Sequence, residues 1–169
     1  SISYQWQTFT GGVWTNVGSD QSTYTTPSLG IGTYPYRVQV TQNSGCFAES
    51  ATVNVEVVGD PTVTVSADET TICDGGVAML TATPSNGTGV NHYQWQQLIG
   101  GNWTNVGTDQ ATYTSGPLTP GNYEYRVILS QDAGCEATSA GQSITVIQDP
   151  TVNVDADDLE ICDGGSTTL

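Results

Sequence analysis

Four cysteines are the residues of this chain best suited to form covalent links. Cys46 and Cys135 each follow a glycine, whereas Cys73 and Cys162 each stand in the motif Ile-Cys-Asp-Gly-Gly. No two of them form a closely spaced CxxC pair, so the sequence does not indicate a zinc or redox motif. Widely separated cysteines of this kind favour structural disulfides in an oxidising compartment.

Few other residues have the types and spacing needed for chemistry. Asp155, Asp157 and Asp158 form an acidic cluster, and calcium binds about six to eight oxygen ligands. They match no EF-hand loop, so we favour a solvated acidic face over a calcium site and expect no other metal or cofactor. His92 is the single histidine, and no nucleophile with a base can be assembled, so we expect no catalytic residues and no enzymatic activity.

Trp14 and Trp103 each stand in Trp-Thr-Asn-Val-Gly, shortly after a Gly-Gly turn. Exposed aromatic rings at such turns can stack on sugars, which makes a surface glycan one candidate ligand. Packing on the protein's own sheet is the more common role, and we favour it. Arg37 and Arg126 are the only cations, and we expect them to form ion pairs with carboxylates such as Asp20 and Asp109.

The elements that must position these residues are repeated along the chain. Tyr-Gln-Trp-Gln at 4–7 returns at 93–96, and Ile-Cys-Asp-Gly-Gly at 72–76 returns at 161–165, each 89 positions later and without a gap. A period of this size predicts a tandem array of domains. We therefore expect a partial module over 1–59, a complete module over 60–148 and a partial module over 149–169, within a longer protein.

Composition restricts the class of partner. The chain has 17 acidic residues against two arginines and no lysine, giving a formal net charge of −15. Such a surface repels phosphates and anionic lipids, so we expect neither nucleic acid partners nor membrane insertion of this segment. No apolar run approaches the length of a membrane span.

The complete module has an apolar–polar alternation of period two, which predicts strands with one buried face. We expect about seven short strands separated by Gly, Pro, Asn and Asp turns, which indicates an all-β fold of tandem immunoglobulin-like sandwiches. The predicted strands include 62–67, 77–83, 93–98, 123–129 and 136–147. The predicted aromatic core consists of Trp6, Trp95, Tyr34, Tyr36, Tyr123 and Tyr125.

Three disulfide arrangements are open. We favour Cys73 with Cys135, which leaves Cys46 and Cys162 to partners outside the chain. A second arrangement pairs Cys46 with Cys73 and Cys135 with Cys162, and a third joins Cys135 to the preceding module. The sandwich places the two turns of the favoured pair at opposite ends, and cysteines with Cα atoms more than about 7 Å apart cannot bond.

The repeated motifs resemble a known family. Ile72–Gly76, Leu80–Ala82, Tyr93–Trp95, Gly121–Tyr123 and Gly134–Ser139 are similar to the immunoglobulin-like repeats of Bacteroidetes surface proteins, which include gliding adhesins exported by type IX secretion. The resemblance implies a cell-surface or extracellular stalk, adhesin or filament component. The resemblance implies no catalytic residues in this chain.

We therefore expect a non-enzymatic rod segment whose partners are neighbouring repeats of the same protein. One alternative is a short subunit that polymerises head to tail, because 149–169 could supply the first strands that 1–59 lacks. A further alternative is a carbohydrate-binding adhesin module.

Overall fold

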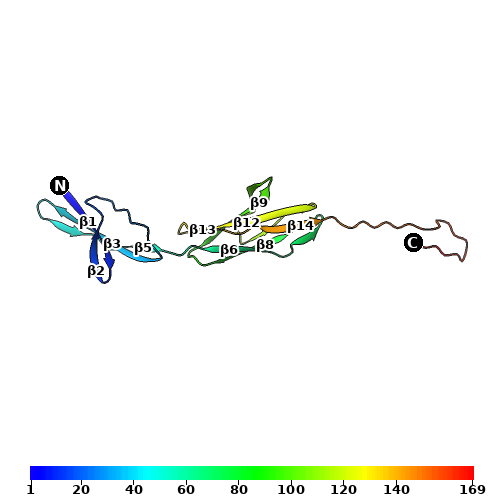
Figure 1. The fold of residues 1–169 in the computed structure, drawn as a ribbon, viewed down its shortest axis with the longest axis horizontal. Helices are drawn as coiled ribbons and strands as arrows, with labels where there is room; N and C mark the ends of the chain where they lie inside the picture. The colour runs from blue at the N-terminus through cyan, green and yellow to red at the C-terminus, as the bar shows by residue number, and fades with distance from the viewer. The chain divides into compact units, whose positions relative to one another are not determined.

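The structure, a computed structural model, describes residues 1–169 and consists of strands joined by turns and irregular segments (Figure 1). It contains no helix of the length and apolarity that crossing a membrane requires. Backbone contacts divide the chain into one unit of Ser1–Thr62, Pro84–Asn91 and Leu129–Ala137, and another of Val63–Thr83, His92–Ile128 and Thr138–Leu169.

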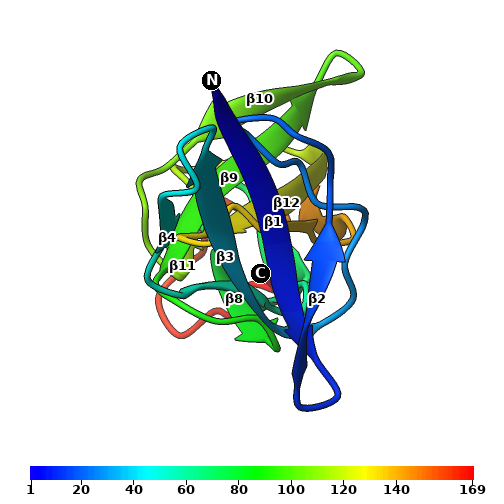
Figure 2. The same ribbon diagram turned by 90° about the vertical axis from the view of Figure 1, so that its left-hand side faces the viewer.

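One sheet is formed by the N-terminal residues, in the order β2-β1-β3-β4, with β5 also paired to β3. Figure 2 shows β1 between β2 and β3. Gly11 and Gly12 have φ values of 61° and 85°, the left-handed conformation that a tight two-residue hairpin turn requires. The strands are β1 (Ile2–Thr10), β2 (Val13–Val17), β3 (Gly32–Gln42), β4 (Phe47–Glu49) and β5 (Val53–Val57).

The following residues form two sheets. The larger has the order β10-β9-β12-β14-β7 with β13 paired to β12, and the smaller has the order β11-β8-β6. The strands are β6 (Thr62–Ala67), β7 (Thr71–Cys73), β8 (Met79–Ser85), β9 (Asn91–Ile99), β10 (Asn102–Val106), β11 (Thr112–Thr114), β12 (Gly121–Gln131), β13 (Glu136–Thr138) and β14 (Gln142–Ile147).

These two sheets pack face to face through an aromatic and aliphatic core. Tyr113 of the smaller sheet lies 5.9 Å from Trp95 and 5.7 Å from Tyr125 of the larger one, measured between ring centroids. Leu80, Trp95 and Tyr125 are fully buried. The predicted all-β, immunoglobulin-like sandwich is therefore confirmed.

Some predicted strands differ in detail. The expected strand 136–147 is interrupted between β13 and β14, because the Ser139 hydroxyl accepts a hydrogen bond from Val127 N at 3.0 Å and donates to Ala140 O at 2.9 Å. At Cys73 the sequence predicts only a turn. Thr71–Cys73 is instead a strand, β7, which pairs in parallel with β14.

Candidate functional sites

The two tryptophan motifs form the same polar row in each copy. The Arg126 guanidinium carbon lies 4.2 Å from the Trp103 ring centroid, and Arg126 Nε donates to Gln96 at 2.9 Å. Gln96 in turn donates to Asn105 at 2.8 Å. A cation over an exposed indole contributes about 0.5–1 kcal/mol. The row therefore holds the edge hairpin of β9 and β10 against β12.

In the N-terminal sheet the corresponding row consists of Trp14, Arg37, Gln7 and Asn16. The Arg37 guanidinium carbon lies 4.3 Å from the Trp14 ring centroid, and Phe9 packs on the same indole at 5.3 Å. One face of each candidate tryptophan is thus covered by the chain's own arginine. A sugar has only the remaining surface of Trp14 or Trp103 available for stacking.

The expected ion pairs of the arginines with Asp20 and Asp109 are wrong. Arg37 instead pairs with Glu49 at 2.9 Å, and Arg126 contacts Gln96. Asp20 and Asp109 accept hydrogen bonds from the backbone nitrogens of Tyr4 and Tyr93, both at 2.6 Å. Since these carboxylates are engaged within their own modules, they are not available to the arginines.

Asp109 also lies 2.7 Å from His92 Nδ1. The hydrogen bond from His92, followed by that from Tyr93 N, lowers the pKa of the Asp109 carboxyl below its ordinary value. No nucleophile lies in this pair, and its two side chains are about half exposed. The arrangement fixes the loop before β11 rather than forming a reactive centre.

The cysteines are all free thiols, so the favoured Cys73–Cys135 disulfide is absent. Cys73 ends β7 opposite Ile147, just beyond the Gly121 end of β12, whereas Cys135 follows the Gln131 end. An eleven-residue strand extends about 35 Å, far more than the roughly 7 Å that a disulfide spans. Cys46 and Cys162 are exposed.

The acidic candidates are not brought together. The Asp155 carboxylate accepts a hydrogen bond from Ala156 N at 3.0 Å, and Asp158 N donates to the Thr167 hydroxyl at 3.0 Å. No group of three or more His, Cys, Asp or Glu side chains is placed to hold a metal ion. The three aspartates therefore do not form a calcium ligand set in this arrangement.

The predicted aromatic residues have two different roles. Trp95, Tyr125 and Tyr36 are buried. Tyr34 and Tyr123 instead direct their hydroxyls to backbone carbonyls four residues upstream, Gly30 O and Thr119 O, both at 3.0 Å. This is the tyrosine corner of immunoglobulin-like domains. Trp6 is only half-buried, because the sheet that contains it is open on one face.

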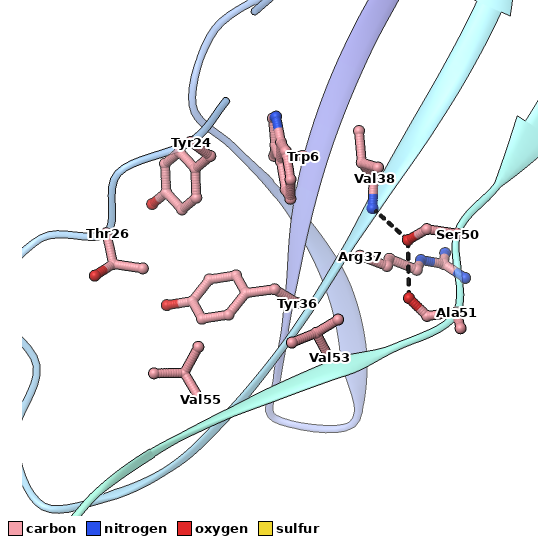
Figure 3. A pocket seen from close by; sticks show the side chains of 10 residues that line it. All are labelled: Trp6, Tyr24, Thr26, Tyr36, Arg37, Val38, Ser50, Ala51, Val53 and Val55. Atoms are coloured by element: carbon pink, nitrogen blue, oxygen red, sulfur yellow. Dashed lines mark hydrogen bonds between the residues drawn. The ribbon is translucent and has the colours of Figure 1, made fainter. Parts of the chain in front are cut away.

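That open face forms a groove of about 480 Å³. Figure 3 shows Trp6, Tyr24, Tyr36, Val53 and Val55 around it. Its lining is mostly apolar and contains no pair of groups suited to acid–base chemistry. No motif of the sequence predicts this groove, because its lining residues come from segments that are far apart along the chain.

The model of the family described as Domain of unknown function (DUF8696) matches residues 62–148. Among the curated proteins, none matches the chain. The family match covers the second copy of the repeat and more than half of the chain.

Solved structures with a similar arrangement share little sequence with it. The fibronectin(III)-like modules of Clostridium thermocellum CbhA are 20% identical, with a TM-score of 0.47, covering 89% of this chain and 83% of theirs. The amphioxus IgVJ-C2 molecule is 16% identical, with a TM-score of 0.40, covering 85% and 87%. The eight N-terminal Ig domains of Down Syndrome Cell Adhesion Molecule are 14% identical, with a TM-score of 0.39, and the chain covers 24% of their length.

Proposed function

We propose, for a chain that belongs to the family described as Domain of unknown function (DUF8696), a non-enzymatic mechanical role as a stalk or rod segment of a bacterial cell-surface or extracellular protein. The tandem 89-residue repetition supports this role, because a linear array of similar domains extends a chain without adding new chemistry. Its proposed partners are neighbouring repeats of the same protein. The net charge of −15 argues against a nucleic acid partner.

One observation carries the proposal: the parallel pairing of β7 with β14, near the two ends of the module. Thr71, Ile72 and Cys73 lie opposite Thr145, Val146 and Ile147. When the ends of a module are pulled apart, the last strand, β14, and the parallel strand β7 near the start of the module are forced to slide past each other. Their hydrogen bonds then share the load instead of opening one after another, and this arrangement resists force.

The junction before the complete module also suits a stalk. Only Val58–Pro61 separates β5 from β6, and Pro61 is buried. A short junction with a proline has little slack compared with a long glycine-rich linker.

Single-molecule pulling of the chain from its two ends tests this role. We expect a distinct unfolding peak, with a contour-length gain of about 30 nm for 60–148 at roughly 0.36 nm per residue. Thr145→Pro removes the N–H that donates to Thr70 O at 2.8 Å and should lower the unfolding force. Thr145→Ala keeps that N–H and serves as the matched control.

Unfolding of the wild-type chain without a resolvable force peak would contradict the mechanical role. So would equal unfolding forces for the proline and alanine variants, because β7 and β14 would then not carry the load.

A further inference from the structure

The two arginine rows differ in the partner of the guanidinium group. In the first copy, Arg37 Nη1 donates to one carboxylate oxygen of Glu49 at 2.9 Å, and Gln39 donates to the other oxygen at 2.6 Å. Glu49 belongs to β4, which pairs with β3 so that Glu49 lies opposite Gln39. A carboxylate from the neighbouring strand therefore docks on the arginine of this row.

The complete copy has the same row without that carboxylate. The counterparts of Gln39 and Glu49, 89 positions later, are Ile128 and Thr138, and neither can replace the acidic group. Arg126 donates from Nε to Gln96, whereas its Nη1 and Nη2 donate to no protein group and form no salt bridge. Two guanidinium nitrogens of Arg126 are thus left for an external acceptor.

An unpaired guanidinium is unusual in so acidic a chain. Arg126 is the only arginine of 60–148, and the whole chain has 17 acidic residues. Its planar group matches a carboxylate, which accepts two parallel N–H bonds from it. The indole of Trp103 and the amide of Gln96 already hold the guanidinium in place, so little side-chain freedom is lost on binding. Arg126 is also partly exposed.

The surroundings of Arg126 indicate what carries the carboxylate. The Trp103 indole lies beside it with part of its surface exposed. Asn105 is exposed, and its Nδ2 donates to no protein group, because the bond to Gln96 uses its oxygen. An aromatic ring suits the apolar face of a sugar, and an amide N–H suits a hydroxyl. A sugar ring that bears a carboxylate is a uronic acid.

We propose that the outer face of β9, β10 and β12 in the complete module binds a uronic acid residue of a glycan. The carboxylate accepts hydrogen bonds from Nη1 and Nη2 of Arg126, as Glu49 accepts one from Arg37. The sugar ring contacts the exposed part of Trp103, and Asn105 donates to a hydroxyl. The net charge of −15 repels long acidic polymers, so the uronic acid is one residue among neutral sugars.

Isothermal titration calorimetry of the full chain tests the proposal with two disaccharides. One is glucuronosyl-β-1,4-glucose, and the other is cellobiose, its neutral analogue with the same linkage. We expect one acidic disaccharide bound per chain, with a Kd lower than that for cellobiose by about tenfold or more. In NMR spectra the Nε–H signal of Arg126 and the indole N–H signal of Trp103 should shift on binding.

Thr138→Glu supplies the missing carboxylate from within the protein. It should occupy Arg126 as Glu49 occupies Arg37, and it should weaken binding of the acidic disaccharide by about tenfold or more. The row itself is unchanged in this variant. Thr64→Glu is the matched control, because it adds the same charge at an exposed position of β6, in the smaller sheet. It should leave the Kd nearly unchanged.

The first copy offers the converse experiment. Glu49→Thr removes the carboxylate that occupies Arg37 and leaves Trp14 and Asn16 in place. This variant should bind two acidic disaccharides per chain instead of one. The Nε–H signal of Arg37 should then shift as that of Arg126 does.

Absence of binding, equal affinities for the two disaccharides, or equal effects of Thr138→Glu and Thr64→Glu would each overturn the proposal. Unchanged stoichiometry in Glu49→Thr would also overturn it. Tighter binding of the peptide Gly-Glu-Gly than of the acidic disaccharide would assign the site to acidic peptides instead. None of these results bears on the force resistance of 60–148, which depends on β7 and β14. The inference goes beyond the mechanical role and can fail separately from it.

Discussion

Two tyrosines on β12, two residues apart, place their hydroxyls in opposite environments. The Tyr123 hydroxyl donates to Thr119 O at 3.0 Å. The Tyr125 hydroxyl is buried without a hydrogen-bond partner. Tyr125 occupies the place of the second disulfide cysteine of antibody domains, and Ala82, where the first would stand, is also buried. The ring fills volume there, whereas its hydroxyl contributes no bond.

Removal of these two hydroxyls should therefore affect stability differently, with a loss only at Tyr123. Tyr123→Phe loses a hydrogen bond and should lower the free energy of unfolding by about 1 kcal/mol. Tyr125→Phe removes an unsatisfied buried group and should leave that free energy unchanged or raise it by up to about 1 kcal/mol. Urea denaturation of both variants provides the measurement, and each variant is the control for the other. A clear loss in Tyr125→Phe would mean that its hydroxyl has a partner, such as bound water.

The environment of Tyr125 also predicts a loss of stability at alkaline pH. Burial, and then the nearby Tyr113 and Tyr123, raise the pKa of Tyr125 to about 12. The unfolded value is about 10, so the folded state favours the neutral form. The contribution of neutral Tyr125 to the free energy of unfolding is fully present below pH of about 10, and it is lost as the pH rises through about 12.

Tyr125→Phe should therefore reduce the fall in stability above pH of about 10, whereas Tyr123→Phe should retain it. Urea denaturation at several alkaline pH values measures the slope for each variant. An unchanged slope in Tyr125→Phe would assign the alkaline transition to another group.

At the scale of elements, one short strand shows how pairing decides structure. Thr112–Thr114 forms β11 beside β8, and Tyr113 from this strand joins the two halves of the core. Gly107, in the loop before it, has a φ of +70°, and a Cβ there would lie 2.8 Å from Cδ2 of Tyr113. The glycine thus allows the loop to pass close to the ring that anchors the strand.

Gly107→Ala should consequently destabilise the module more than Gly101→Ala does. Both positions have positive φ, at +70° and +81°, and both substitutions cost about 1 kcal/mol for that reason. Gly101 has no atom within 4 Å of an added Cβ, so only Gly107 displaces the tyrosine ring. We expect an additional loss of about 1–2 kcal/mol at Gly107, measured by thermal or urea unfolding. Equal losses would show that the ring moves aside without cost.

At the scale of the whole molecule, the two copies of the repeat differ in how deeply their apolar side chains are buried. The complete module buries Trp95, Val127 and Ile144 fully, whereas the N-terminal sheet leaves Val53 and Val55 exposed. Since burial of apolar surface is the main stabilising contribution, the two copies should differ in stability.

Hydrogen exchange should reveal this difference. Amides of β1 and β3 should exchange before those of β9 and of β12 up to Ile128, although the paired strands have similar sequences. The comparison is internally controlled, because each peptide has its counterpart 89 positions later in the same sample. Equal protection of the two copies would contradict the assignment of stability to the second sheet.

The sequence alone determined the repeat, the all-β sandwich and the inward position of Trp95, because period, alternation and turn residues are local signals. It did not determine the parallel strand β7, the break at Ser139 or the arginine partners. These features depend on which strands pair with each other, and that pairing is set by residues far apart in the sequence. Tertiary structure alone also decided whether the sequence Thr-Tyr-Thr forms a strand. It is a strand at 112–114 and not at 23–25. A strand needs hydrogen bonds from a neighbour, and a local sequence cannot supply the neighbour.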